Sequence, residues 1–385
     1  MTENIRPFDN ELLPHYLNGY YKSLFPFESY IKWLSYSKDP KESFGHREFV
    51  FILKDGIHIR YKCYDNPEEF TKELRSTAPE KLDLGPVYNH RPKFHKTVVN
   101  FAPVEREFVM DIDMTDYDDV RTCCKDANVC NKCWKFIVVA IEVLDHTMRS
   151  TFGFGKLLWV FSGRRGVHCW VADEKARKLS NSARSAIISF LGINSKENLK
   201  TIHTAGNKDP FTEEAFRKML ESPTFNKMVF EQGWLEDEAK FLKDNFNPTT
   251  AQKLKAGFAV LKTAQSKWSM LKDYYFGNET SPYILTVIGG LRKFVIKTAF
   301  PRLDERVSVS MNHLLKSPFC IHPKTGNVAV PIDVHNLAGM KVEDFPRIDD
   351  LLRELQVAKS DGNATKYNSS LQPYISLFDK FVSNL

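Results

Sequence analysis

The stretch EFVMDIDM, residues 107–114, decides the fold class of this chain. Because successive side chains of a β-strand point to opposite faces, the apolar residues at positions 108, 110, 112 and 114 share one face, and Asp111 and Asp113 share the other. Two carboxylates two positions apart are about 6–7 Å apart at the backbone, so they can converge on a shared pair of metal ions. Mg²⁺ suits such a site because it takes oxygen ligands and keeps positions open for phosphate and water. The alternative is an edge strand with solvated acids, since Asp-x-Asp is a common string.

A cluster of cysteines follows this strand. Cys123, Cys124, Cys130 and Cys133 lie within eleven residues, whereas the other three cysteines are isolated in the sequence. The Cys-x2-Cys half is typical of tetrahedral Zn²⁺ sites, and four thiolates leave no open coordination position, which indicates a structural metal. The first residues lack the apolar run of a signal peptide, so we expect a reducing compartment, where such a cluster binds metal rather than forming disulfides. The alternative is a set of reduced core cysteines.

A third motif is SGRRGVH, residues 162–168. Its two glycines allow a tight turn, and its hydroxyl, paired guanidinium and imidazole groups are donors suited to phosphate oxygens. The alternative is an ordinary exposed hairpin turn. A fourth segment, HLLKSPFCIHPK at residues 313–324, follows PRLD at residues 301–304. It is either a second anion-binding edge or a strand with a solvated basic face, and spacing alone leaves both open.

The surrounding pattern indicates a mixed α+β core with a helical insert. Strands are predicted at 48–53, 56–61, 107–114, 157–161 and 167–171. Helices are predicted over 11–24 with Asn10 as cap, over 137–148 closed by Gly153, and from a cap at Asp173 through Leu179, Ala183, Ile187 and Phe190. From Ile193 to Gly277 strand patterns end, and short helical patterns are separated by Pro210, Pro223 and Pro248. The segment 371–385 is predicted to be a helix that packs against its own core, with a docking helix as the alternative.

Composition sets outer limits on the function. The 385 residues are 42% hydrophobic and 26% charged, which suits two or three globular units and excludes wholesale disorder. No stretch of about 18 uncharged apolar residues occurs, so a membrane span is not expected. The net charge of +6 permits a polyanionic partner without requiring one.

Taken together, the four motifs resemble the small catalytic subunit of eukaryotic DNA primase. REFVMDIDMTDYDDVR, the cysteine cluster, WVFSGRRGVHCWV and PRLD…NHLLKSPFCIHPKTG occur in this order. The similarity extends from SLFPF near the N-terminus, through HREFVF and VYNHRP, to about Asp333. The helical insert and the tail are similar only in general character.

The resemblance implies roles for individual residues. Asp111, Asp113 and Asp304 would hold two Mg²⁺ or Mn²⁺ ions. The incoming triphosphate would be bound by Ser162, Arg164, Arg165 and His168, with Lys316 and His322 completing the pocket. Arg60 and Asp83 match positions near the nucleotide, Asp83 being a candidate for the ribose hydroxyl. The four clustered cysteines match the zinc ligands.

The resemblance also implies an architecture and partners. The fold would be an α/β archaeo-eukaryotic primase core, formed by residues 1–192 with the zinc motif at 123–133 and by residues 282–385, around a helical subdomain at 193–281. The partners would be single-stranded DNA template, ribonucleoside triphosphates, a large primase subunit with an iron–sulfur domain, and DNA polymerase α. Nuclear residence follows from the family alone.

Two rival functions remain. A primase-polymerase of damage tolerance or end joining would share the carboxylates and prefer deoxynucleotides, but the cysteine insertion directly after Asp-x-Asp argues against it. A non-catalytic zinc-bearing nucleic-acid module would leave the three acids and the Ser-Gly-Arg-Arg-Gly turn without a purpose.

Overall fold

Two antiparallel sheets form around the strands expected from the sequence. In the computed structural model, residues 7–36, 39–191, 210–360 and 369–385 are described. Contacts divide the chain into a first unit of residues 1–111, 154–188 and 304–385 and a second unit of residues 112–153 and 189–303. The mixed α/β class is confirmed, whereas the expected boundaries at 193 and 281 stay a prediction.

The first unit holds a sheet in the order β2-β1-β3-β4, with β8 also paired to β3. Its strands are β1 (Arg47–Ile52), β2 (His58–Lys62), β3 (Lys81–Tyr88), β4 (Pro103–Glu105) and β8 (Leu315–Lys316). A second sheet has the order β5-β7-β6, with strands β5 (Phe108–Asp113), β6 (Leu157–Phe161) and β7 (Gly166–Val171). Strand β5 crosses the division, which falls after Asp111.

The helices of the first unit complete its core. They are α1 (Leu13–Ser23), α2 (Phe27–Ser35), α3 (Pro40–Ser43), α4 (Pro67–Thr77), α6 (Glu174–Arg177), α7 (Asn181–Leu191, which runs into the second unit), α15 (Glu305–Val309), α16 (Ile348–Ser360) and α17 (Gln372–Ser383). The Trp33 ring of α2 packs edge-on against Trp170 of β7 at 5.6 Å and against Phe378 of α17 at 5.7 Å. Because Phe378 is fully buried, the segment after residue 371 packs against its own core as expected.

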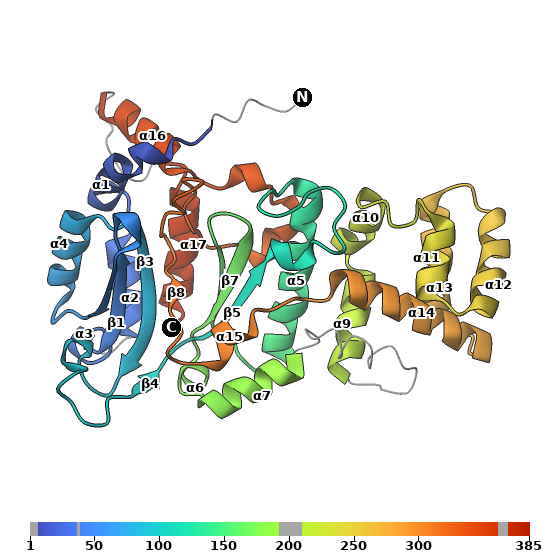
Figure 1. The fold of residues 1–385 in the computed structure, drawn as a ribbon, viewed down its shortest axis with the longest axis horizontal. Coiled ribbons are helices and arrows are strands. Elements are labelled where there is room, and N and C mark those ends of the chain that lie inside the picture. The colour runs from blue at the N-terminus through green and yellow to red at the C-terminus, as the bar shows by residue number, and fades with distance from the viewer. Residues whose placement is uncertain (1–6, 37–38, 192–209, 361–368) are drawn as a thin grey trace. The chain divides into compact units, whose positions relative to one another are not determined.

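The second unit is mainly helical, and its helices between residues 210 and 276 agree with the helical patterns of the sequence. It consists of α5 (Asn131–Ser150), α9 (Pro210–Glu221), α10 (Pro223–Glu231), α11 (Glu238–Asn245), α12 (Pro248–Ala259), α13 (Ala264–Phe276) and α14 (Pro282–Ala299), which run from green through yellow to orange in Figure 1. Four of these helices begin with proline, whose missing N–H costs nothing in the first turn. Their core packs around Trp234 and Phe294, whose rings are 5.5 Å apart. None of the described helices is long and apolar enough to cross a membrane.

One predicted helix start was wrong, and one predicted helix is interrupted. Asp9 rather than Asn10 caps the first turn, and α1 begins only at Leu13. Helix α6 begins directly after Asp173 as expected, although the Asp173 carboxylate accepts the amides of Gly155 and Lys156 rather than an amide of its own helix, and the expected continuous helix is interrupted between α6 and α7. The buried Arg184 side chain donates to carbonyls at the break, including that of Leu179 at 3.0 Å.

Candidate nucleotide site and cysteine cluster

The motif SGRRG forms the tight turn between β6 and β7. The amide of Ser162 donates to the carbonyl of Gly166 at 2.9 Å, and the amide of Gly166 donates to the Ser162 hydroxyl at 3.1 Å. The Ser162 side chain therefore closes the turn from within. Arg164 and Arg165 at the tip are half-buried.

This turn lies directly against the segment that follows β8. Gly163 has φ +91°, and a Cβ there would come within 2.7 Å of the Cβ of His322, so only glycine fits. The Thr325 hydroxyl donates to the Gly163 carbonyl at 2.6 Å. The Lys316 ammonium donates to the Ser162 carbonyl at 2.9 Å. The structure thus brings together Ser162, Lys316 and His322, which the sequence singled out separately.

Asp83 lies on the same side of its sheet as Lys316. Strands β3 and β8 are antiparallel, with Asp83 directly opposite Lys316. Lys81 shares that face because it is two positions from Asp83 on the strand. Burial raises the pKa of Asp83, while the positive charges of Lys316 and Lys81 oppose the rise. Burial also lowers the pKa of Lys316.

Positive charges crowd around His322. Burial, followed by the charges of Lys316 and Arg164, lowers the pKa of this imidazole to about 3. Lys81 and Lys324 contribute in the same direction. The imidazole is therefore neutral at physiological pH, and the surrounding cations create a positive potential. Such a pocket is suited to a multiply charged anion.

Two of the three candidate metal-binding acids meet at the end of β5. The amide of Asp304 donates to the carbonyl of Asp111 at 3.0 Å. Asp304 is the exposed N-cap of α15, and its side chain accepts the amide of Arg306 at 3.1 Å. On β7, His168 places Nε2 3.6 Å from Asp111 Oδ1, with only 7% of the His168 side chain exposed. Asp111 thus lies beside the His168 imidazole and is bonded through its backbone to Asp304.

Asp113, the last residue of β5, belongs to the second unit. Its Oδ1 accepts the Thr115 amide at 2.9 Å and the Thr115 hydroxyl at 2.7 Å. These bonds cap the short 3-10 turn Met114–Tyr117 and fix the carboxylate orientation.

Arg60 is not brought into contact with the other candidates. It lies on β2, which β1 separates from β3. Its guanidinium makes two hydrogen bonds to the fully buried Glu48, at 3.0 and 3.2 Å, and its side chain remains 39% exposed. A role at the nucleotide therefore stays a proposal for this residue.

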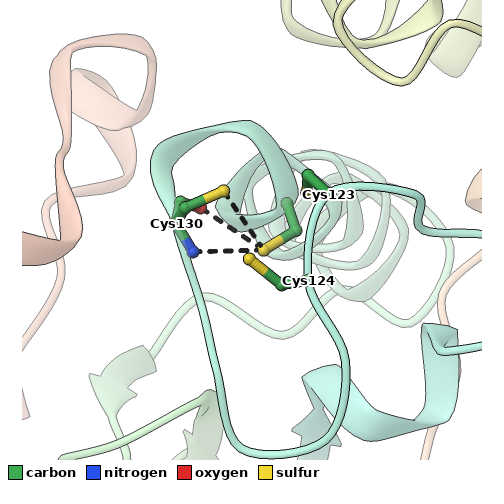
Figure 2. A group of neighbouring side chains, drawn as sticks. Cys123, Cys124 and Cys130 are labelled. Atoms are coloured by element: carbon green, nitrogen blue, oxygen red, sulfur yellow. Dashed lines mark hydrogen bonds between the residues drawn. The ribbon is translucent and has the colours of Figure 1, made fainter.

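The four clustered cysteines form a compact set of thiols. Their Sγ atoms all lie within 4.8 Å of one another, and within the described ranges no other group of three or more histidine, cysteine or carboxylate ligands is gathered so closely. None of them forms a disulfide. Figure 2 shows Cys123, Cys124 and Cys130 on one loop. Cys130 is also the N-cap residue of α5, and its amide lies 3.2 Å from Cys133 Sγ.

Two side chains fix the loop around these thiols. The buried guanidinium of Arg121 donates to the carbonyls of Asn128 and Asp126, both at 2.8 Å, and lies 3.9 Å from Cys133 Sγ. Gln232 of the helical unit donates to Cys123 Sγ at 3.5 Å while its carbonyl accepts the Thr122 amide at 2.8 Å. Donors aimed at sulfur favour thiolates, which are the form that binds metal.

Comparison with known proteins decides the family. The sequence model of the DNA primase small subunit matches residues 110–334. The chain is 43% identical to the DNA primase small subunit of Caenorhabditis elegans, over 96% of this chain and 97% of that protein. Identity is 35% with the Schizosaccharomyces pombe protein (95% and 88% covered) and 33% with that of Saccharomyces cerevisiae (95% and 90%). The chain belongs to the DNA primase small subunit family.

Membership confirms the expected activity class. This primase subunit is a nucleotidyltransferase that makes RNA primers for DNA replication. The family match includes the three acids, the SGRRG turn and the cysteine cluster. Arg60 and Asp83 precede it and lie in the part covered by the eukaryotic relatives. The family's name, small subunit, implies a partner subunit.

The sequence alone missed three residues that shape this primase site. Lys81 was detectable from strand period two, since it precedes Asp83 by two positions. Glu48 carried no such signal, because a buried acid beneath an arginine is visible only once β1 and β2 pair. Gln232 is 109 positions from Cys123, so only the folded chain reveals its contact.

Proposed function

We propose that this primase extends RNA primers at the site formed by Asp111, Asp113 and Asp304, which together hold two divalent cations, Mg²⁺ or Mn²⁺. The observation that carries the proposal is the bond from Asp304 to Asp111, whose carboxylate interacts electrostatically with Lys316, one of the cations around His322. Carboxylate oxygens are the ligands these ions prefer. Bound there, such ions lower the pKa of an attacking hydroxyl and neutralise charge on the leaving oxygens.

The reaction needs no protein nucleophile. The 3′-hydroxyl of the primer attacks the α-phosphate of a ribonucleoside triphosphate, a new phosphodiester bond forms, and pyrophosphate leaves. Lys316, Arg164 and Arg165 hold the triphosphate in line, so positioning and electrostatics supply most of the rate enhancement. The backbone and hydroxyl of Ser162 shape the turn that presents the two arginines.

The two histidines have different proposed tasks. His168 lies 3.6 Å from Asp111 and orients that carboxylate while facing the phosphates. His322 is neutral before substrate binds, because burial and its cationic neighbours lower its pKa to about 3. Approaching phosphates would offset those cations and raise the pKa of His322, which strengthens its donor capacity when the substrate is bound.

Asp83 and Arg60 complete the proposed nucleotide site. Asp83 on β3 lies directly opposite Lys316 on the adjacent strand β8. Its carboxylate is therefore an acceptor close to the proposed triphosphate site and is suited to recognise the ribose hydroxyl. Arg60 has two guanidinium bonds to Glu48 and remains partly exposed, so it can still present N–H groups to a ligand.

We further propose that Cys123, Cys124, Cys130 and Cys133 bind one structural Zn²⁺. Four thiols within 4.8 Å, with donors from Arg121 and Gln232, fit tetrahedral thiolate coordination, which leaves no position for substrate.

The proposed partners are single-stranded DNA template, a large primase subunit with an iron–sulfur domain and, beyond it, DNA polymerase α. Outside the cluster this chain has only Cys63, Cys169 and Cys320, of which the last two are buried. An iron–sulfur cluster takes four ligands, so these three cysteines agree with a division of labour between the subunits. The proposed location is the nucleus.

The test uses zinc-loaded protein, a homopolymeric thymidine template, a short RNA primer and labelled ATP or dATP with Mg²⁺ or Mn²⁺. Wild type should add ATP, and the double variant Asp111→Ala/Asp113→Ala should add none while keeping its thermal unfolding temperature. Preference for dATP would favour the primase-polymerase alternative. Absence of metal-dependent nucleotide binding would favour the non-catalytic module.

A further inference from the structure

The loop between β3 and β4, residues 89–102, is basic and lacks acids. No Asp or Glu occurs from Leu84 to Val104, while the loop contains five basic or imidazole side chains: His90, Arg91, Lys93, His95 and Lys96. Arg91 and Lys93 share a single carboxylate, Asp65. Among the described acids, none pairs with Lys96, which is exposed. The loop therefore presents uncompensated positive charge.

Two pairs of stacked rings each include one residue of this loop. The Tyr61 ring of β2 lies parallel to the His95 imidazole, with centroids 3.7 Å apart and planes at 16°. Tyr88 and Phe101 form a second stacked pair at 4.1 Å and 15°. Phe94 at the loop's short 3-10 turn is 48% exposed, and Val99 is 81% exposed. Exposed apolar groups alternate with cations here rather than forming a purely apolar patch.

The loop is preorganised and connected to Arg60 through Glu48. The Asn89 amide group donates to the Asn100 carbonyl at 2.8 Å, and its oxygen accepts the Ala102 amide at 3.0 Å. Tyr61 has φ +58°, an unusual conformation for a tyrosine that directs its ring at the loop, and Glu48 accepts its amide at 3.1 Å. The same carboxylate accepts Arg60 and the Tyr88 hydroxyl. One buried acid thus connects Arg60 to both ring pairs.

We propose that the loop 89–102 binds the single-stranded template DNA, with phosphates at Lys93 and Lys96 and a base stacked on Phe94. The inference rests on the proposed function and adds the surface for its polyanionic substrate. Single-stranded nucleic acid is recognised by cations that follow the backbone and by rings on which bases stack. A protein partner would be expected to meet a less charged apolar surface.

The test measures binding of fluorescent oligothymidylate to the full chain by anisotropy at several salt concentrations. Phe94→Ala should weaken binding by about five- to a hundredfold, the range for loss of one stacked base. Lys96→Gln should reduce the slope of log affinity against log salt by about 0.7. Phe276→Ala and Lys255→Gln are matched controls in the helical unit, since Phe276 is 50% exposed and Lys255 is exposed, and both should bind as wild type does.

Kinetics separate this inference from the proposed chemistry. In primer extension, Phe94→Ala should raise KM for the primed template and leave KM for ATP and kcat unchanged. The variant Asp111→Ala/Asp113→Ala should lose primer extension but bind oligothymidylate with the affinity of wild type. If Asp111→Ala/Asp113→Ala still extended primers, the metal site would be overturned and the loop assignment would remain intact.

If binding is too weak for anisotropy, photocrosslinking to an iodouridine-containing template identifies the peptides that contact the template. Crosslinks to the peptide that contains Phe94 are expected. Crosslinks restricted to other segments, or unchanged affinity and KM in both loop variants, would overturn the proposal. If those variants instead lost association with the partner subunit, the loop would be a protein interface.

Discussion

The amide of Asp304 donates to the carbonyl of Asp111 across 3.0 Å, and this bond joins the end of β5 to the start of α15. Each of the two residues also carries a carboxylate side chain. Because a backbone bond fixes the two positions, either side chain can be removed without disturbing the contact that aligns them. This makes the pair suited to substitution experiments.

Replacement of Asp304 by alanine should lower the primer-extension rate by about a thousandfold, since electrostatic groups at a reacting centre contribute at this scale. The neighbouring Glu305 is equally exposed, so Glu305→Ala is the matched control and should retain activity. Single-turnover kinetics with saturating ATP measure the effect. Equal rates for the two variants would contradict the assignment of Asp304.

Loss of a cluster cysteine should destabilise the helical unit. Cys124→Ser should reduce bound zinc below one equivalent, measured by mass spectrometry of the metal, and lower the thermal unfolding temperature, because a structural zinc site contributes folding free energy directly. Cys63→Ser is the control, since Cys63 is half-exposed and lies outside the cluster. Full zinc content in Cys124→Ser would contradict four-thiolate binding.

Removal of the Lys316 charge should change both the KM for ATP and the pKa of His322. Lys316→Met should raise KM for ATP about tenfold, whereas Lys324→Met, an exposed lysine near the same histidine, should change it little. The pKa of His322, lowered to about 3 by burial and then by Lys316, should rise toward its ordinary 6.5. Imidazole chemical shifts followed over pH measure this directly, and an unchanged His322 titration would contradict the proximity of the two groups.

Acid should weaken the fold through Glu107. Burial opposes its ionisation, but the salt bridge with Arg47 at 2.9 Å and the Tyr36 hydroxyl lower its pKa from 4.5 to about 2. A carboxyl whose pKa is lower in the folded state stabilises it above pH 4.5, and this contribution is lost as the pH falls from 4.5 toward 2. Urea unfolding at pH 7 and pH 3 measures the loss.

The variant Glu107→Gln tests the same pair at neutral pH. It leaves the fully buried Arg47 guanidinium without its counter-charge, so the free energy of unfolding at pH 7 should fall by about 3–5 kcal/mol. Its stability should also change less between pH 7 and pH 3 than that of wild type. The same pH dependence in both proteins would contradict this role for Glu107.

The sequence by itself determined the features that depend on near neighbours. Alternation of side chains set which residues of β5 face the solvent with Asp111. Glycine at 163 and 166 set the β6–β7 turn, and the Cys-x2-Cys spacing at the start of α5 set the thiol cluster. Each of these is a local consequence of backbone geometry.

Only the tertiary structure decided which hydrogen bonds connect the strand β5, the β6–β7 turn and the segments around β8 and α15. Lys316 donates to Ser162, 154 positions away, and Asp304 bonds to Asp111, 193 positions away. The break between α6 and α7 has the same origin, since Arg184 satisfies carbonyls that a continuous helix would have bonded itself. Hydrogen bonds between distant residues depend on packing, and packing has no local signature in the sequence.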